Sequence, residues 1–185
     1  KALQHYARRA YSPVLVSPYM DGEKVSVKAI SDKAEAFEGR MEAFIMDFGG
    51  DILWNETIGC RLQADESADL MSVDAALLDG NRLLYVRILK DGVTVSENTF
   101  YTRFPKEYEY GCPEISFEVQ ECAEGLELTV SSDRLARGLY LFSDNADDFF
   151  EDNYMDLLPG FPRKITVRTG STAEEFKTTL KYQTL

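Results

Sequence analysis

The chain is built largely from short segments in which apolar and polar residues alternate, and tight turns separate these segments. The clearest example is RLLYVRILK at 82–90, in which Leu84, Val86 and Ile88 fall on one face. A period of two is the pattern of a half-buried β-strand. KDG at 90–92 follows as a tight turn, and VTVSENTF then supplies a partner strand. These residues predict an antiparallel hairpin.

The same alternation predicts about seven strands in the first half of the chain and six or seven in the second. The clearest of these segments are EKVSVKAIS, RMEAFIMDF, DFGGDILWNET, EISFEVQE, LELTVSS, GLYLFSD, RKITVRT and EEFKTTLKY. Gly49-Gly50 indicates a two-residue hairpin loop, whereas ESADLMSVDAALLDG fits a helix or a strand. Regularly spaced short strands without helical crossovers predict an all-β fold, namely two tandem immunoglobulin-like antiparallel β-sandwiches, and they disfavour a parallel-sheet enzyme.

A short helix is expected before the first strand. Leu3, Tyr6, Ala7 and Ala10 have the spacing of one helical face, and Ser12-Pro13 ends the helix. A polar and aromatic stretch, TRFPKEYEYGCPE, interrupts the strand pattern and marks a domain junction. We therefore expect a helix or linker over residues 1–12, one sandwich over 13–103 and a second over 104–185. Because the chain opens within a helical pattern, we expect it to be part of a larger protein.

Composition narrows the range of partners. The chain is 44% hydrophobic and 28% charged, as in ordinary globular proteins, and its apolar runs are too short to span a bilayer. Its net charge of −12 leaves no basic surface for phosphate groups. We therefore expect neither nucleic acid nor a membrane as a partner.

The residues that usually carry chemistry are few. His5 is the only histidine, so a Ser-His-Asp site or a zinc site is disfavoured. Cys60, Cys112 and Cys122 form no CxxC motif. A Cys112–Cys122 disulfide is one alternative, and small buried thiols are the favoured one. No glycine-rich phosphate-binding motif is present, and we expect no cofactor.

Acidic residues are abundant, but their spacing singles out no site. The run SDNADDFFEDN at 143–153 fits no EF-hand register, so a solvated loop is favoured over a calcium site. Glycoside hydrolysis uses two carboxylates, yet 32 acidic residues make many coincidental pairs. The residues alone therefore nominate no catalytic residue and no metal ligand.

Aromatic residues are the remaining candidates for ligand binding. Trp54 lies in a predicted strand beside a hairpin, where it would stack on a sugar ring or pack against a sandwich core, and we favour core packing. Tyr101, Tyr108 and Tyr110 lie near the junction, and we expect them to join the two domains to each other or to a further domain.

The stretch DNYMDLLPG at 152–160 has the composition of a structural corner. Asp and Asn side chains bond nearby backbone and tolerate the left-handed conformation, so Asp152 and Asn153 suit a bend. Tyr154, Met155 and Leu157 are expected to pack into a neighbouring core. Pro159-Gly160 fits the central positions of a type II turn.

These residues resemble a known family. LARGLYLFSDNADDFFEDNYMDLLPGFPRKITV resembles the last immunoglobulin-like domain of β-mannosidases in glycoside hydrolase family 2. Met155 stands where Phe is common, and the opening KALQHYARRAYSPVLVS resembles the passage from the barrel into the first C-terminal sandwich. The matching positions are Asp152, Asn153, Tyr154, Asp156, Leu157, Leu158, Pro159 and Gly160.

The resemblance implies a parent enzyme that removes terminal β-D-mannose from non-reducing ends with retention of configuration. Its two catalytic glutamates would lie upstream on a (β/α)₈ barrel, so no catalytic residue is assigned to this chain. The chain would supply a mannosidase Ig/CBM-like domain and a terminal Ig domain that pack against the barrel and orient it.

Two alternatives remain at this point: a carbohydrate-binding module for mannan or manno-oligosaccharides, and an unrelated surface adhesion tandem. For the compartment, a bacterial periplasm or cytoplasm is preferred, and a lysosome if the protein is eukaryotic.

Overall fold

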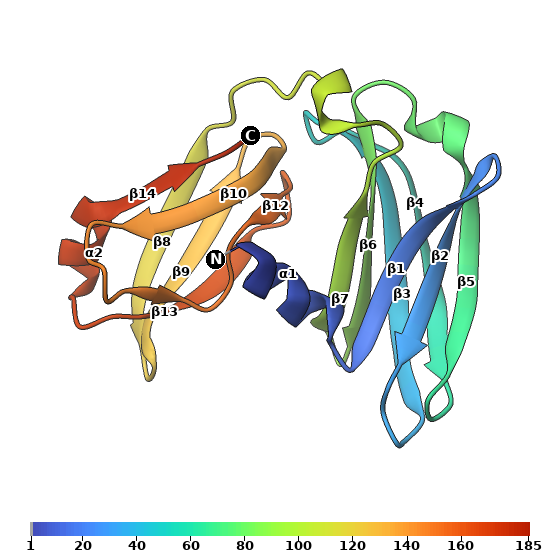
Figure 1. The fold of residues 1–185 in the computed structure, drawn as a ribbon, viewed down its shortest axis with the longest axis horizontal. Helices are drawn as coiled ribbons and strands as arrows, with labels where there is room; N and C mark the ends of the chain where they lie inside the picture. The colour runs from blue at the N-terminus through green and yellow to red at the C-terminus, as the bar shows by residue number, and fades with distance from the viewer. Residues whose placement is uncertain (1) are drawn as a thin grey trace. The chain divides into compact units, whose positions relative to one another are not determined.

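The computed structural model describes residues 2–185, which divide into two compact units. Ala7–Glu109 form one unit, and Tyr110–Leu185 form the other together with residues up to Tyr6. Figure 1 shows that both units consist mainly of antiparallel strands. Within the described residues, none of the helices combines the length and apolar character needed to cross a bilayer.

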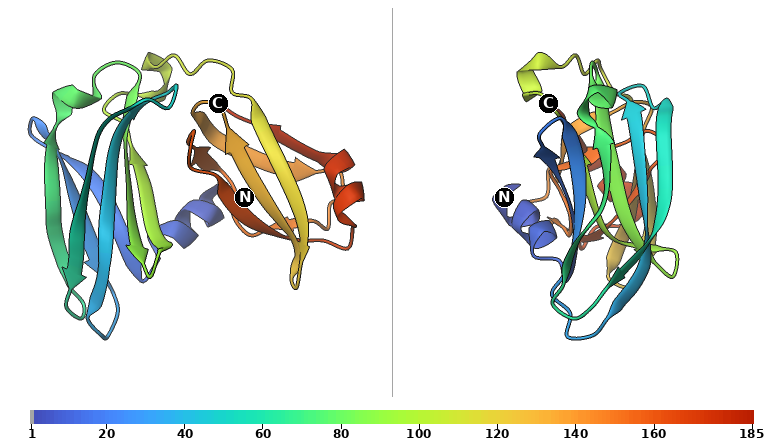
Figure 2. Two further views of the ribbon diagram at one scale, coloured as in Figure 1. Left: turned by 180° about the vertical axis from the view of Figure 1, so that it is seen from behind. Right: turned by 90° about the vertical axis from the view of Figure 1, so that its right-hand side faces the viewer.

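The first unit holds seven strands in two sheets (Figure 2). One sheet has the order β1-β2-β5 and the other the order β4-β3-β6-β7. The strands are β1 (Val14–Asp21), β2 (Lys24–Ser31), β3 (Phe37–Asp47), β4 (Ile52–Leu62), β5 (Ser67–Asp74), β6 (Arg82–Lys90) and β7 (Val93–Phe100). The two sheets share one core, to which β2 contributes Val25 and Val27 and β6 contributes Leu84, Val86 and Ile88. The predicted inward face of β6 is therefore confirmed.

The predicted turn between β6 and β7 is also confirmed. Lys90 pairs with Val93, which leaves only Asp91 and Gly92 in the connection. Their φ angles are 53° and 82°. Two successive residues with positive φ are typical of a type I′ hairpin, whose twist matches that of the flanking strands.

The second unit is a smaller sandwich of the same class. One sheet has the order β11-β13-β9-β8 and the other the order β12-β10-β14. Its strands are β8 (Ile115–Cys122), β9 (Gly125–Ser132), β10 (Ala136–Ser143), β11 (Phe149–Phe150), β12 (Met155–Leu157), β13 (Arg163–Arg168) and β14 (Leu180–Gln183). Leu126, Leu128 and Val130 of β9 lie in its core, as their alternation predicts. The predicted all-β class with two immunoglobulin-like sandwiches is therefore confirmed.

One predicted strand is wrong over much of its length. EEFKTTLKY begins as helix α2 (Ala173–Thr179), and only Leu180–Gln183 form a strand. The helix begins at a capping box: Thr172 Oγ1 accepts a hydrogen bond from Glu175 N at 3.4 Å, and Glu175 Oε2 accepts one from Thr172 N at 2.9 Å. Phe176 is fully buried in the core, and this burial favours the helical turn over an extended edge strand.

One open alternative is resolved, and one further local prediction needs revision. The ambiguous segment at 66–80 forms strand β5, followed by a short 3₁₀ turn at Ala75–Leu78. The connection between β3 and β4 covers residues 48–51 and is longer than the predicted two-residue loop. Asp47 Oδ1 accepts hydrogen bonds from Gly49 N and Asp51 N at 2.9 and 3.0 Å, and these bonds stabilise the longer loop.

The opening helix is confirmed as α1 (Ala2–Ala10); Lys1, which the prediction included, lies outside the described residues. Arg8 and Arg9 lie in its last turn, where positive charge suits the helix dipole. Its apolar positions are not core residues: Leu3 and Tyr6 are 80% and 53% exposed.

The cysteines also differ from the favoured prediction. Cys60 is buried, but Cys112 and Cys122 are exposed, and all three are free thiols. Cys112 precedes β8 and Cys122 ends it, so an extended strand separates the two residues. At about 3.3 Å per residue, that strand holds the two cysteines too far apart for a disulfide.

Candidate functional site

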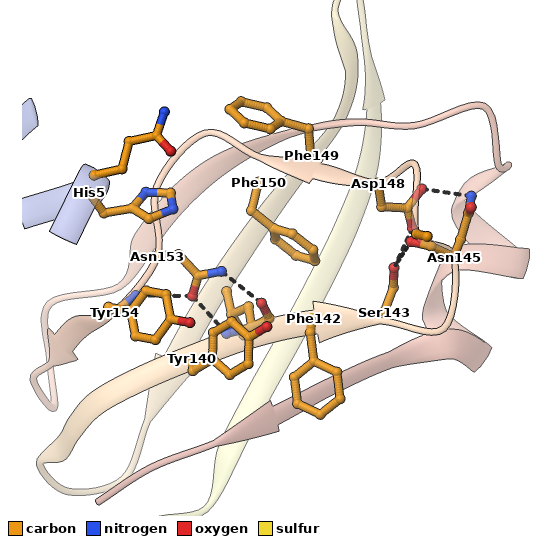
Figure 3. A pocket seen from close by; sticks show the side chains of 13 residues that line it. His5, Tyr140, Phe142, Ser143, Asn145, Asp148, Phe149, Phe150, Asn153 and Tyr154 are labelled. Carbon is orange, nitrogen blue, oxygen red and sulfur yellow. Dashed lines mark hydrogen bonds between the residues drawn. The ribbon is translucent and has the colours of Figure 1, made fainter. Parts of the chain in front are cut away.

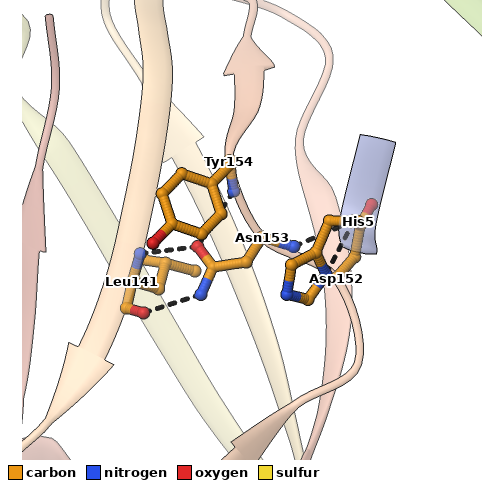
Figure 4. A network of polar contacts seen from close by, with 5 residues as sticks. All are labelled: His5, Leu141, Asp152, Asn153 and Tyr154. Carbon is orange, nitrogen blue, oxygen red and sulfur yellow. Dashed lines mark hydrogen bonds and ion pairs between the residues drawn. The ribbon is translucent and has the colours of Figure 1, made fainter. Parts of the chain in front are cut away.

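The corner at 152–160 is held to strand β10 by side-chain hydrogen bonds to the backbone (Figure 4). Asn153 is 4% exposed, and its side chain bonds both polar backbone groups of Leu141. Oδ1 accepts from Leu141 N at 2.8 Å, and Nδ2 donates to Leu141 O at 2.7 Å. The amide therefore takes the place of a neighbouring strand at this point of β10.

Asp156 makes a second connection to the same strand. Its Oδ1 accepts a hydrogen bond from Gly138 N at 2.9 Å. Gly138 has a φ of 62° and lies where the pairing of β10 with β12 shifts register between Ala136 and Leu139. A backbone N–H at such a bulge has no ladder partner, and the carboxylate supplies one.

The remaining corner residues follow the sequence prediction in part: Tyr154, expected in the core with Met155 and Leu157, is half-buried and stacks on Tyr140 outside the core. Met155 and Leu157 are buried in the core. Phe161 N donates to Leu158 O at 3.1 Å across Pro159 and Gly160, and Gly160 has a φ of 79°. This geometry confirms the type II turn. The left-handed residue of the bend is Tyr154, with a φ of 53°, rather than Asp152 or Asn153.

An aromatic row extends from this corner along the outer side of β10. Tyr154 stacks on Tyr140 with ring centroids 4.6 Å apart, and Tyr140 stacks on Phe142 at 5.2 Å. His5 of α1 lies 6.0 Å from Tyr154, and its Nδ1 is 3.8 Å from Asp152 Oδ1. We call Tyr140, Phe142 and Tyr154 the aromatic row. Burial, together with the neighbouring Tyr140 phenol, raises the pKa of Tyr154 above its ordinary value.

A hollow of about 320 Å³ opens beside the aromatic row (Figure 3). Tyr140, Phe142, Phe149 and Phe150 are among the residues that line it; Phe150 points toward the core, and Phe149, which pairs with Arg168, points to the outer side of β11. Phe149 is 49% exposed, whereas Phe150 is buried. The hollow therefore has apolar walls that remain accessible to solvent.

One end of the hollow is polar. Asp148 accepts hydrogen bonds from Ser143 Oγ at 2.6 Å and from Asn145 Nδ2 at 2.9 Å. Asn145 Oδ1 accepts from Asp147 N at 3.2 Å. These bonds fix the loop after β10 and hold a carboxylate and an amide at the rim of the hollow (Figure 3).

The sequence pattern did not indicate this hollow. The available signal was GLYLFSD, which is apolar on both faces: Leu139 and Leu141 enter the core, and Tyr140 and Phe142 face the other way. The contribution of Phe149, seven residues beyond Phe142, depends on how the acidic loop folds back, and strand periodicity does not predict that.

Trp54, the sequence candidate for sugar stacking, lies elsewhere. It pairs with Ile45 across β3 and β4 and packs, half-buried, against the core of the first unit. This position favours the core-packing alternative.

The junction tyrosines have partners within their own units. Tyr101 and Tyr108 pack with Phe48, and Tyr110 accepts a hydrogen bond from Arg137 at 2.6 Å.

Among residues 2–185, no group of three or more His, Cys, Asp or Glu side chains is arranged to hold a metal ion.

Two family models match the chain in succession. A mannosidase Ig/CBM-like domain matches residues 23–107, and an Ig-fold domain of the mannosidase type matches residues 112–185. No curated protein sequence matches the chain.

Solved structures show the same fold. The β-D-mannosidase from Dictyoglomus thermophilum superposes with a TM-score of 0.91 and 22% identity, over 100% of this chain and 23% of that one. The exo-chitosanase CsxA from Amycolatopsis orientalis gives a TM-score of 0.66 and 16% identity, over 98% of this chain and 26% of that one. The chain thus spans about a quarter of the length of these enzymes. The two domain matches, taken in order along the chain, identify a mannosidase Ig/CBM-like domain at 23–107 followed by an Ig-fold domain at 112–185.

Proposed function

We propose that the chain forms non-catalytic accessory domains of a glycoside hydrolase that removes terminal β-D-mannose from non-reducing ends. The observation that carries this proposal is the succession of two mannosidase domain families over residues 23–107 and 112–185. The likeness of the whole chain to about a quarter of a β-D-mannosidase supports the same activity for the parent protein. The role of these domains is to pack against the catalytic domain and fix its orientation.

The geometry of the corner supports a structural role for its polar residues. Catalytic carboxylates of glycosidases face each other across a substrate at about 5–10 Å. Asp156 instead bonds the backbone of β10, and Asp152 accepts from Asn153 N at 2.8 Å. Their oxygens serve the fold, and the hydrolytic carboxylates are assigned to a barrel domain of the parent protein.

A hydrolysis assay tests the proposal. The 185-residue chain is incubated with 4-nitrophenyl β-D-mannopyranoside, and we expect no release of nitrophenolate above the buffer rate. Turnover that persists through a second, different purification step would refute the non-catalytic assignment.

The gene provides an independent check. We expect the reading frame that contains Lys1 to encode a (β/α)₈ barrel of about 250 residues before it. Expressed whole, that protein should hydrolyse the mannoside faster than the corresponding β-D-glucosaminide. A preference for the glucosaminide would instead favour the activity of the exo-chitosanase.

A further inference from the structure

Strand β4 is an open edge of the first unit. It has eleven residues and stands at the end of the order β4-β3-β6-β7, so that only β3 pairs with it. Among the described residues, the backbone of residues 52–62 makes no hydrogen bond outside the pairing with β3. Every second residue of β4 therefore turns its N–H and C=O away from β3, where another strand can bond them.

The edge formed by β1 in the same unit is closed by side chains. Val16 of β1 donates its N–H to Ser96 Oγ at 2.9 Å, and its carbonyl accepts from Asn98 Nδ2 at 3.3 Å. Both side chains belong to β7, the last strand of the other sheet. Within residues 2–185, no side chain bonds the backbone of β4 in this way, so its edge stays open to strand pairing.

Most of the sequence of β4 favours such pairing. The strand contains no Pro and no Lys, which commonly protect edge strands. Ile52 and Leu53 are 48% and 49% exposed, and Trp54 and Ile58 are only partly buried against the core. A further strand would cover these apolar side chains and add cross-strand contacts.

Glu56 is the exception. It lies opposite Ala43 of β3, which is fully buried, and residues directly opposite each other point to the same face of a sheet. Glu56 is therefore on the core side of β4, between Trp54 and Ile58, which pack against the core. It is exposed at the open edge, and it makes no hydrogen bond or ion pair with another described residue.

A second copy of the chain has no partner to offer this carboxylate. Two β4 strands that pair antiparallel about a two-fold axis keep the core sides of both copies on the same face. Arg61 is the only cation of the strand; it lies on the opposite face and pairs with Glu38. Depending on the register, Glu56 therefore faces one of the core-side residues of the copy, which are Trp54, Glu56, Ile58, Cys60 and Leu62.

We propose that Glu56 keeps the β4 edge closed to a second copy of this chain. In every such register, pairing buries the carboxylate against an apolar side chain or against another carboxylate, with no cation beside it. The desolvation of an unpaired charge opposes the contacts that the added strand would make. Glu56 is thus the residue that prevents self-association at a strand whose other residues favour it.

Sedimentation equilibrium of the 185-residue chain tests the proposal, with the unchanged chain as the reference. Glu56→Val replaces the carboxylate by an apolar, strand-forming side chain, and its dimer should form at least about tenfold more tightly. Glu56→Lys keeps a charge on the core side and should associate no more tightly than the unchanged chain. Hydrogen exchange of the Glu56→Val chain at high concentration should show new protection of amides in residues 54–62.

Glu118→Val is the matched control. Glu118 is exposed on β8, an edge strand of the other unit, and lies opposite Thr129 on the outer face of its sheet. The substitution removes the same charge from an edge strand but not from a core side, so association should match that of the unchanged chain. Circular dichroism confirms that each variant is folded.

Four results would overturn the proposal. The first is a Glu56→Val chain that associates no more tightly than the unchanged chain. The second and third are association of Glu56→Lys or of Glu118→Val as tight as that of Glu56→Val. The fourth is a Glu56→Val dimer in which exchange along β4 is unchanged.

Discussion

Replacing Asn153 by Ala tests whether the corner holds strand β10. The substitution leaves Leu141 N–H and C=O without the partners that they have at 2.8 and 2.7 Å. Each buried polar group left unpaired costs about 1–3 kcal/mol. With the lower half of that range for each group, the free energy of unfolding of this domain should fall by about 3 kcal/mol. Small domains have only about 5–15 kcal/mol in total, so this loss is a large fraction.

Two measurements follow the effect. Urea unfolding monitored by circular dichroism gives the free energy, and hydrogen exchange should show faster exchange of the Leu141 amide. Trp54 is the only tryptophan and lies in the first unit, so its fluorescence reports separately on that unit. Gln120→Ala serves as the control because Gln120 is exposed on β8 of the same domain, and it should cost less than about 1 kcal/mol.

Asn153→Asp refines the test. The carboxylate keeps the acceptor to Leu141 N but loses the donor to Leu141 O, and burial raises the pKa of such a group. The variant should therefore be weakened at neutral pH and should regain stability relative to wild type as the pH falls and the carboxyl becomes a donor. An Asn153→Ala free energy within about 0.5 kcal/mol of wild type, with unchanged Leu141 exchange, would refute the reasoning.

Four further predictions use other parts of the chain. Gly39→Ala should destabilise the first unit by about 2 kcal/mol in urea unfolding, because the new Cβ would lie 2.5 Å from Leu89 O. Gly59→Ala on the paired strand is its control: the new Cβ there meets open space, and the free energy of unfolding should be nearly unchanged. Thr172→Ala should cost about 1 kcal/mol as a lost helix cap. The Thr172 backbone N–H lowers the pKa of Glu175, so the stability that this carboxylate contributes is present above its unfolded pKa of about 4.3 and is lost as the pH falls. Glu175→Gln should remove this pH dependence of stability in an acid titration. An unchanged stability profile would contradict the prediction. Iodoacetamide should label Cys112 and Cys122 in the native chain but Cys60 only after unfolding, as mass spectrometry would show, because Cys60 is buried and burial raises its thiol pKa.

The strands could be predicted because their period depends on local sequence. In β9 the buried residues are two positions apart, so burial of one face is enough to fix the pattern. β6 is buried on both faces, but the residues that it contributes to the core between the sheets, Leu84, Val86 and Ile88, still alternate. The turn at Asp91-Gly92 was equally predictable, since few residues adopt positive φ at two successive positions.

The error at α2 has a physical cause that the sequence did contain. Short amphipathic segments fit a period of two and a period of 3.6 about equally well, and EEFKTTLKY is such a segment. Thr172 followed by Glu175 is the capping-box signature, and it would have resolved the ambiguity in favour of a helix.

The partners of the corner could not be predicted in the same way. Asn153 and Leu141 are twelve residues apart, and nothing in the alternation of β10 shows that Leu141, which pairs with Tyr182 of β14, has no strand partner on its β12 side. The sequence identified the corner and its turn, but the groups that it holds depend on how the sheet ends, which is a property of the folded domain.

The structural corner and the hollow are connected through a single strand. Leu141 enters the core and bonds Asn153 through its backbone, while its neighbours Tyr140 and Phe142 face the other way and form one wall of the hollow. The amide that fixes Leu141 therefore also fixes the rings on either side of it. A corner whose amide and carboxylate oxygens bond the backbone of β10 therefore also sets the positions of the aromatic residues on the other face of that strand.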